Sequence, residues 1–254
     1  MFGNRRIGRI CAAPFQLRHY RALCNMACVC GNFVGNMRRY LTERGEYPYD
    51  LNLRTPIGRM PIRLYNPHDL LTLNEIFCRV DYPADRNTRV VVDLGSNIGI
   101  SALYFLTRNL ECFCYLFEPD IRNVAKLKKT LEGMESRYAL TEKAVSHVAG
   151  QVEFGIESTG RYGGIGAKTG QSVSVECLEI NAVLRSVLER ADYIDVLKVD
   201  TEGVEIPTVE AIQPELLARI KRIYVEATPS QTIRPEMFRR RQYGGVCQLT
   251  NRNL

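Results

Sequence analysis

The sequence predicts an α/β fold: a mostly parallel sheet with helices on both faces, an inserted β-hairpin, and a basic helical extension before it. Three observations predict this fold. Short apolar runs, typical of strands buried on both faces, alternate with segments whose apolar residues recur at helical spacing. Two segments of period two flank a glycine-rich loop, which indicates the hairpin. Strands that alternate with helices favour parallel pairing and right-handed crossovers.

The first 85 residues are predicted to form a helical, arginine-rich extension, and residues 86–254 a separate domain. Residues 1–44 hold eight arginines and one acid, Glu43, for a net charge of +7. The whole chain carries +6, so the remaining 210 residues carry about −1. This arm could be a solvated helix face, or it could meet an anionic membrane surface or an anionic acceptor. No RNP motif or zinc-finger spacing supports nucleic-acid binding.

The predicted elements follow in order along the chain. The extension is expected to hold helical segments within residues 1–44, a short hairpin around Met60–Tyr65, a helix at His68–Val80 and a linker at Asp81–Thr88. The domain is expected to hold strands at Arg89–Leu94, Cys112–Pro119, Tyr138–Ser146, Tyr193–Asp200 and Arg222–Ala227, with helices between them and hairpin strands at 151–156 and 171–177. The segment Tyr243–Leu254 offers one more strand, so a closing antiparallel hairpin is expected to be very short or to lack its last strand.

Nine cysteines and the hydropathy of the chain bear on the compartment. Cys24, Cys28 and Cys30 have no second metal-binding knuckle, so we expect buried free thiols on a helix rather than a metal site. The cysteine usage fits a reducing compartment. No run of 18 apolar residues occurs, and no signal-peptide cleavage site follows Arg5 and Arg6. We therefore expect a cytoplasmic protein that could be peripheral to a membrane.

A glycine loop between two apolar segments carries the strongest functional signal. Asp93 ends the first predicted strand, Gly95–Gly99 opens the next helix, and Glu118 ends the second strand. In parallel sheets, ligands bind at the carboxyl ends of strands where the strand order reverses. The loop lacks the G-x-G-x-x-G pattern that a pyrophosphate requires. Its D-x-G-x-x-x-G pattern suits S-adenosylmethionine, because Asp93 could meet the ammonium and Glu118 the ribose hydroxyls.

Several motifs resemble those of the FkbM-type S-adenosylmethionine-dependent methyltransferases. They are "VVDLGSNIGISALYF", "YLFEPD", "VSVECLEINAVL", "IDVLKVDTEGVEIPTVEAI" and "RIYVEA", in the same order and spacing over about Asp69–Ala227. The resemblance implies a class I methyltransferase, Rossmann-like fold and usually O-methylation of a hydroxyl. It also implies cofactor contacts from Asp93, Gly95, Ser96, Asn97, Gly99, Glu118 and Pro119, with Lys143 and Ala144 near the adenine. Ser96 and Glu179 depart from the family's usual Ala and Asp.

The chemistry of methyl transfer to a hydroxyl requires a base, and an acid cluster follows the fourth predicted parallel strand. Asp200 is the first candidate for the base and Glu202 the second, and Lys198 points to the same face of the strand as Asp200. The cluster could instead be a structural ion-pair network, or could hold Mg²⁺ together with Glu226. Tyr82, in the linker, could cover the cofactor or simply pack.

The function expected from these observations is S-adenosylmethionine-dependent O-methylation of a sugar, a glycolipid or a natural product. Two alternatives stay open. One is a nucleoside-cofactor-binding oxidoreductase, which the missing G-x-G-x-x-G disfavours. The other is a catalytically silent cofactor-binding or scaffold protein that uses the basic arm. The acceptor and the oligomeric state are not encoded in any motif of the chain.

Overall fold

The computed structural model describes residues 17–157, 163–167 and 171–254, and the side chains from Tyr20 onward. The first part of the predicted arm, with Arg5, Arg6, Arg9 and Cys11, lies outside the described residues, as does part of the glycine-rich loop Gly160–Gly170. The chain divides into two compact units, Met1–Pro83 and Ala84–Leu254. Each unit is considered by itself.

The first unit contains helices and one hairpin. Its elements are α2 (Leu17–Val29), α3 (Phe33–Thr42), β1 (Tyr49–Thr55), β2 (Gly58–Leu64), α4 (Pro67–Leu73) and the π-helix η2 (Asn74–Arg79). The β1–β2 hairpin is antiparallel over the full length of both strands, so it begins about eleven residues before the predicted one. Asn66 caps α4 by accepting hydrogen bonds from His68 and Asp69, which explains where this helix begins.

The predicted burial of two cysteines in this unit is wrong. Cys24 and Cys28 are exposed on α2, whereas Cys30 at the end of that helix is buried. The reason is that α2 turns the face that holds Ala22 and Met26 inward, and both of these side chains are buried. The cysteine spacing correctly predicted a helix, but it could not predict which face of that helix is buried.

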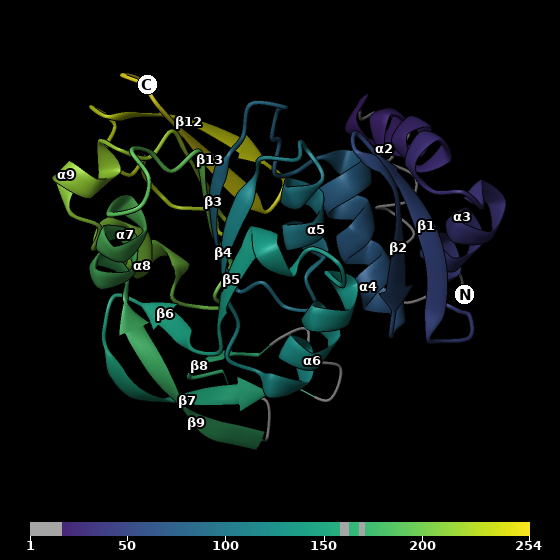
Figure 1. Cartoon of the computed structure of the whole chain (residues 1–254), viewed down its shortest axis with the longest axis horizontal. Coiled ribbons are helices and arrows are strands. Elements are labelled where there is room, and N and C mark those ends of the chain that lie inside the picture. Colours follow the sequence, from purple (N-terminus) through teal and green to yellow (C-terminus); the bar gives the residue numbers. More distant parts are fainter. Residues whose placement is uncertain (1–16, 158–162, 168–170) are drawn as a thin grey trace. The chain divides into compact units, whose positions relative to one another are not determined.

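The second unit is built on a seven-stranded sheet in the order β12-β13-β11-β10-β3-β4-β5 (Figure 1). The strands are β3 (Val90–Leu94), β4 (Phe113–Phe117), β5 (Tyr138–Thr141), β10 (Val196–Val199), β11 (Arg222–Val225), β12 (Phe238–Tyr243) and β13 (Val246–Asn251). β3, β4, β5, β10 and β11 are parallel, and β13 is antiparallel to both of its neighbours. From β3 the chain runs outward to β5 and then returns to β10, so the strand order reverses between β3 and β10.

Helices cover both faces of this sheet (Figure 1). α5 (Ile100–Leu106) and α6 (Ile121–Thr130) lie on one side, and α7 (Ile180–Leu188), α8 (Glu205–Glu210) and α9 (Pro214–Leu217) on the other. A short 3₁₀ helix, η3 (Glu135–Arg137), precedes β5. An apolar cluster of buried side chains joins α7 to β10 and β11. This arrangement confirms the predicted class I methyltransferase, Rossmann-like fold.

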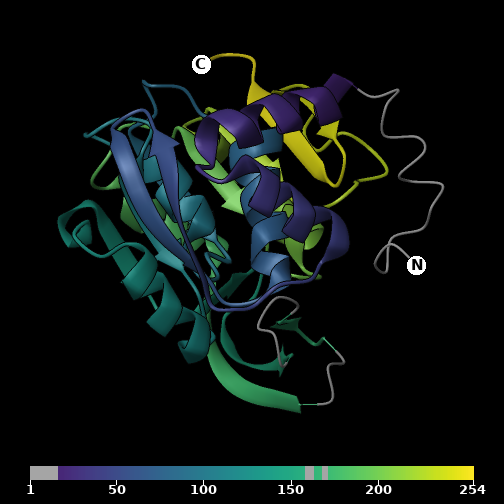
Figure 2. The ribbon, with the colours of Figure 1, turned by 90° about the vertical axis from the view of Figure 1, so that its right-hand side faces the viewer.

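A second, four-stranded sheet in the order β6-β9-β7-β8 lies at the bottom of Figures 1 and 2. Its strands are β6 (Ala144–Ser146), β7 (Gly150–Ile156), β8 (Gly164–Ile165) and β9 (Gln171–Glu179). β7 and β9 pair antiparallel, which confirms the inserted hairpin. The predicted strand Tyr138–Ser146 is in fact two strands, because the chain leaves the large sheet after Thr141 and joins β9 from Ala144.

The end of the chain corrects another expectation. β12 and β13 form a complete hairpin of two six-residue strands, so the closing hairpin is neither very short nor without its last strand. The segment Phe238–Tyr243, which holds three consecutive arginines, was missed because an edge strand with one exposed face lacks an apolar run.

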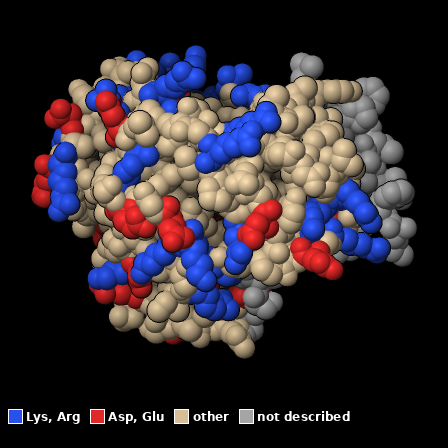
Figure 3. Space-filling model, turned by 45° about the vertical axis from the view of Figure 1, so that its right-hand side comes forward, with Lys and Arg blue, Asp and Glu red and all other residues tan. Residues whose placement is uncertain are grey.

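On the face shown in Figure 3, Lys and Arg side chains form several separate groups with Asp and Glu side chains between them. None of the described helices has the length and apolar content that crossing a bilayer requires.

Candidate functional site

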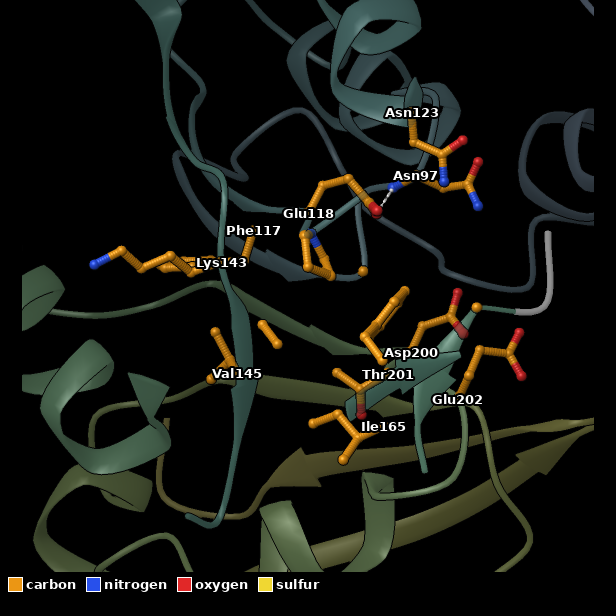
Figure 4. A pocket seen from close by; sticks show the side chains of 15 residues that line it. Asn97, Phe117, Glu118, Asn123, Lys143, Val145, Ile165, Asp200, Thr201 and Glu202 are labelled. Atoms are coloured by element: carbon orange, nitrogen blue, oxygen red, sulfur yellow. Dashed lines mark hydrogen bonds between the residues drawn. The ribbon is translucent and has the colours of Figure 1, made fainter. Parts of the chain in front are cut away.

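A pocket opens at the carboxyl ends of β3, β4 and β10, where the strand order reverses (Figure 4). Ligands of open α/β sheets bind at this kind of place. The residues that line it are Gly95, Asn97, Phe117, Glu118, Pro119, Asn123, Lys143, Ala144, Val145, Phe154, Gly163, Ile165, Asp200, Thr201 and Glu202. Most of them come from three strand ends of the large sheet and from the inserted sheet, and Asn123 comes from α6.

The glycine loop brings backbone close to the end of β10. Gly95 has a φ of 77°, and a Cβ atom there would lie 1.8 Å from the carbonyl oxygen of Asp200. Any other residue would push the two strand ends apart. The N–H groups of Gly95 and Ser96 both donate to the carbonyl of Phe117, at 3.0 and 3.1 Å. Glycine therefore holds the ends of β3, β4 and β10 together.

Glu118 is an almost fully buried carboxylate on the pocket wall. Oε2 accepts a hydrogen bond from the N–H of Asn97 at 2.8 Å, drawn in Figure 4, and Oε1 accepts one from the N–H of Asp120 at 2.9 Å. Burial raises the pKa of Glu118 to about 7, although these two backbone donors and the side chain of Asn123 oppose the rise. Near neutral pH a part of the Glu118 side chains therefore carries a proton.

Asp93 and Lys198 form a buried ion pair directly behind the pocket. They are paired neighbours in the parallel β3–β10 register, so both side chains point to the same face. Lys198 Nζ lies 3.0 Å from Asp93 Oδ1, 3.1 Å from Asp200 Oδ2 and 3.0 Å from the carbonyl oxygen of Gly95. Ser101 Oγ donates to Asp93 Oδ2 at 2.5 Å.

The charges in this cluster favour a cationic lysine. Burial alone would lower the pKa of Lys198, but Asp200 and Asp93 outweigh it and raise that pKa above its usual range. Asp200 is the exposed end of the cluster, with 23% of its side chain accessible, and it lines the pocket. Lys198 therefore fixes the Asp200 carboxylate at the pocket and ties it to the glycine loop.

The turn after β10 is closed by Glu205. Its carboxylate accepts hydrogen bonds from the N–H groups of Thr201 and Gly203, at 3.1 and 2.9 Å. Glu202 lies between them with a left-handed φ of 54°. A Cβ atom on Gly164 would come within 2.2 Å of the carbonyl oxygen of Glu202, so only glycine lets β8 pack against this turn.

The apolar part of the pocket wall is formed by four side chains: Phe117, Val145, Phe154 and Ile165. Lys143 also lines the pocket, but its ammonium group pairs with Glu176 Oε1 at 2.6 Å. Figure 4 shows this side chain pointing away from the other labelled residues. Apolar lining of this kind suits a flat, apolar ligand group.

The structure brings together most of the residues that the sequence singles out. Those that line the pocket are Gly95, Asn97, Glu118, Pro119, Lys143, Ala144, Asp200 and Glu202. Asp93, Ser96, Gly99 and Lys198 do not line it. Asp93 and Lys198 are buried against each other, the Ser96 hydroxyl donates to the Asp93 carbonyl, and Gly99 precedes α5 in a left-handed conformation. Tyr82 belongs to the first unit and is not among the lining residues.

Sequence reasoning missed several lining residues: Phe117, Asn123, Val145, Phe154, Gly163, Ile165 and Thr201. The glycines of the inserted hairpin were a usable signal, since glycine often marks a close backbone approach. Thr201 carried no signal of its own. Its Oγ1 is buried without a hydrogen-bond partner among the described residues, as expected of a group that awaits a ligand or a water molecule.

The donors and acceptors of the pocket fit part of S-adenosylmethionine. A carboxylate such as Glu118 accepts hydroxyl donors, the apolar wall suits a purine, and Thr201 Oγ1 can pair with a polar group. The expected contact of Asp93 with the ammonium does not fit this geometry, because Lys198 and Ser101 already hold that carboxylate. Asp200 and Glu202 are the acids that face the pocket instead.

The alternative that the acid cluster holds Mg²⁺ finds no support. Among the described residues, no group of three or more His, Cys, Asp or Glu side chains is placed to hold a metal ion. Asp200 instead has a lysine ammonium as its cationic partner.

Three solved structures with a similar arrangement are distant from this chain in sequence. An FkbM methyltransferase from Methylobacillus flagellatus matches 94% of this chain at 14% identity with a TM-score of 0.47, and this chain covers 60% of that one. A methyltransferase from Geobacter sulfurreducens matches 66% of this chain at 14% identity (TM-score 0.37, 73% of that chain). An O-methyltransferase family protein from Burkholderia thailandensis matches 73% of it at 11% identity (TM-score 0.37, 59% of that chain).

The sequence itself identifies the family. No curated protein matches the chain. The Methyltransferase FkbM domain, however, matches residues 93–244, from the acid of the glycine loop to the turn between β12 and β13. Because this match covers more than half of the sequence, the chain belongs to the FkbM family of methyltransferases.

Proposed function

We propose that the protein is an S-adenosylmethionine-dependent O-methyltransferase that acts on a hydroxyl of a sugar, a glycolipid or a natural product. The observation that carries the proposal is the arrangement of two acids at one pocket. Glu118 lies at the end of β4 and Asp200 at the end of β10, and both line the pocket at the reversal of strand order. The family match supplies methyl transfer as the reaction class.

The nucleoside part of the cofactor would be held by residues of β4 and β6. Glu118 would accept a ribose hydroxyl, while Phe117, Ala144 and Val145 would pack against the adenine. The cofactor supplies a methyl group on a sulfonium, which already carries the driving force for transfer. The protein must therefore align the acceptor and remove its proton.

Asp200 is the proposed general base. A sugar hydroxyl is a poor nucleophile, and base assistance contributes about 10²–10⁴-fold to the rate. Lys198 holds the Asp200 carboxylate in one orientation. When Asp200 takes the proton, the ammonium of Lys198 keeps a carboxylate partner in Asp93, so no uncompensated charge is left in the interior. Glu202, on the same side of the pocket in Figure 4, is the second candidate.

Calorimetric titration tests the cofactor. We expect S-adenosylhomocysteine to bind and NAD⁺ not to bind, whereas an oxidoreductase would show the reverse. A Glu118→Ala variant separates binding in this pocket from binding elsewhere. Glu142→Ala, which removes an exposed carboxylate from the same unit, is the matched control.

Turnover tests the reaction. Purified protein and cofactor are incubated with fractionated extracts, and mass spectrometry searches for products heavier by one CH₂ group. We expect no methylated product from the Asp200→Asn variant. We also expect the new methyl group to stay on the product under conditions that hydrolyse methyl esters. Cofactor binding without any methylated product across extracts would instead favour the silent cofactor-binding protein.

A further inference from the structure

Helix α2 exposes an apolar face in addition to the face it buries. Tyr20 is 50% exposed and Leu23 40% exposed, and Cys24, Ala27 and Cys28 are exposed as well. These positions follow the i, i+3, i+4, i+7, i+8 spacing of a single helix face. Because the opposite face already packs inside the first unit through Ala22 and Met26, α2 is apolar on two sides. Such a helix normally has both sides covered.

Helix α3 repeats the pattern. Val34 is 76% exposed and Leu41 44% exposed, and Met37 and Arg38 lie between them at i+3 and i+4. Asn36, on the other side of this helix, is buried and accepts a hydrogen bond from Tyr49 at 2.8 Å. Two consecutive helices thus each present an apolar stripe that the described residues of their own unit do not cover.

The charges within α2 and α3 have one sign, and Glu43 follows α3 as its C-cap residue. No Asp or Glu precedes Glu43 in the sequence, and Arg21 and Arg38 are exposed on the two helices. Arg39 has another role, because it stacks on Tyr49 at 4.0 Å and donates to the carbonyl of Glu46. A partner for this surface must therefore offer apolar material and negative charge together.

We propose that α2 and α3 form a docking surface for an anionic lipid bilayer. An interfacial helix buries apolar side chains in the acyl boundary while arginines reach the headgroups. A second copy of the chain would bring arginines against arginines across a two-fold axis, which is unfavourable. A nucleic acid offers phosphates but would meet aliphatic and thiol side chains where stacking aromatics are needed.

Vesicle co-sedimentation of the full chain tests the proposal. Vesicles of phosphatidylcholine alone are compared with vesicles in which a third of the lipid is phosphatidylglycerol. We expect binding to the anionic vesicles at low ionic strength and little binding to the neutral ones. Binding should weaken between about 0.05 and 0.5 M salt, as the screening length falls from above 10 Å toward 3 Å.

Two variants separate the charge from the apolar stripe. Arg21→Gln with Arg38→Gln should lower the partition coefficient by about fivefold for each arginine. Leu23→Ser with Val34→Ser and Leu41→Ser should lower it by about tenfold or more. The matched controls, in the second unit, are Arg86→Gln with Arg190→Gln and Leu110→Ser with Ile121→Ser, all at exposed positions. Thermal melting of each variant checks that it is folded.

Three results would overturn the proposal: no sedimentation with anionic vesicles at low salt, equal binding to neutral vesicles, or equal losses in the arm variants and the controls. A concentration-dependent dimer that the serine variant abolishes, without vesicle binding, would assign the face to a second copy. Salt-sensitive binding of a single-stranded oligonucleotide in place of vesicles would assign it to nucleic acid. None of these outcomes depends on methyl transfer.

Discussion

Asp93 and Glu118 are acids at the ends of neighbouring strands, yet they occupy opposite environments. Asp93 belongs to β3 itself and is fully buried against Lys198. Glu118 follows the last residue of β4 and lines the pocket. Asp93 has a cation as its partner, whereas Glu118 has two backbone N–H groups. A shift of two residues relative to the strand end therefore separates a structural acid from an acid that can meet a ligand.

This difference indicates that the acids of the site have different roles. A residue inside a central strand must find its partner on the adjacent strand, and the β3–β10 register supplies Lys198. A residue just beyond the strand is held by the loop and keeps acceptor positions directed at the pocket. We therefore expect Asp93 to govern stability, Glu118 to govern affinity, and Asp200, which has one lysine contact and one exposed edge, to govern turnover.

The largest expected effect is on stability, from Asp93→Ala. Removing one partner of a buried ion pair leaves Lys198 without its nearest charge and costs about 3–5 kcal/mol of unfolding free energy. Urea denaturation measures this loss. Glu142→Ala, which breaks the exposed pair with Lys128, should cost at most about 1 kcal/mol.

A double variant keeps this prediction testable if Asp93→Ala does not fold. Asp93→Leu combined with Lys198→Met removes both charges and should recover much of the lost stability, since an apolar pair carries no desolvation cost. An Asp93→Ala protein as stable as the Glu142→Ala control would show that the ion pair is not structural.

The second effect is on turnover, from Asp200→Asn. The amide keeps the shape of the side chain but cannot take a proton, so the rate should fall by about 10²-fold or more. Affinity for S-adenosylhomocysteine should change far less than the rate. Glu202→Gln is the comparison variant. If Asp200→Asn retains its rate and Glu202→Gln loses it, the base is Glu202.

The third effect is on cofactor affinity, from Glu118→Ala. Loss of hydrogen bonds to a charged group should weaken binding of S-adenosylhomocysteine by about 1.5–3 kcal/mol. Calorimetry at pH 8 measures it, with Glu142→Ala as the control. Unchanged affinity in a folded Glu118→Ala protein would remove Glu118 from the cofactor site.

The raised pKa of Glu118, about 7, gives this prediction a pH dependence. Folded protein holds the proton more tightly than unfolded chain, so the contribution of Glu118 to stability is present below about pH 4.5 and is lost as the pH rises through about 7. Ligand affinity should move the opposite way and rise through pH 7, because the ionised carboxylate accepts hydroxyl donors better. Glu118→Gln should lack this slope. A wild-type affinity that is flat from pH 5.5 to 8.5, a window of about 1.5 units either side of the pKa, would contradict it.

The smallest expected effect comes from Thr201→Val. Because Thr201 Oγ1 has no partner among the described residues, a bound ligand gains its hydrogen bond, and the variant should lose about 0.5–1.5 kcal/mol of affinity. Thr208→Val is the matched control, since the Thr208 hydroxyl donates to the carbonyl of Val204. The control should change stability and leave affinity intact. The reverse pattern would mean that Thr201 is structural.

The sequence by itself determined the order of the five parallel strands of the large sheet, the glycine loop after β3 and the position of Glu118 at a strand end. These are local properties: apolar runs, helical spacing and glycine at a turn act over a few residues. The motif was sufficient to predict a close backbone contact at Gly95. The positive φ of this residue and its tight packing on Asp200 leave no room for a side chain. The sequence also placed Lys198 and Asp200 on one face of a strand, which is a consequence of the two-residue period.

Only the tertiary structure decided what those residues touch. Asp93 and Lys198 are 105 positions apart, and the β3–β10 pairing alone makes them neighbours. The inserted hairpin reaches the pocket because Gly164 packs on the turn at Glu202, a contact that neither motif contains. The buried face of α2 was also decided by the tertiary structure. The helical period of α2 could be recognised in the sequence, but which face is buried depends on the residues that pack against it. The local sequence determines the periodicity of apolar residues and the position of turns. The residues that become neighbours across a sheet or a helix interface are determined by the packing of the whole unit.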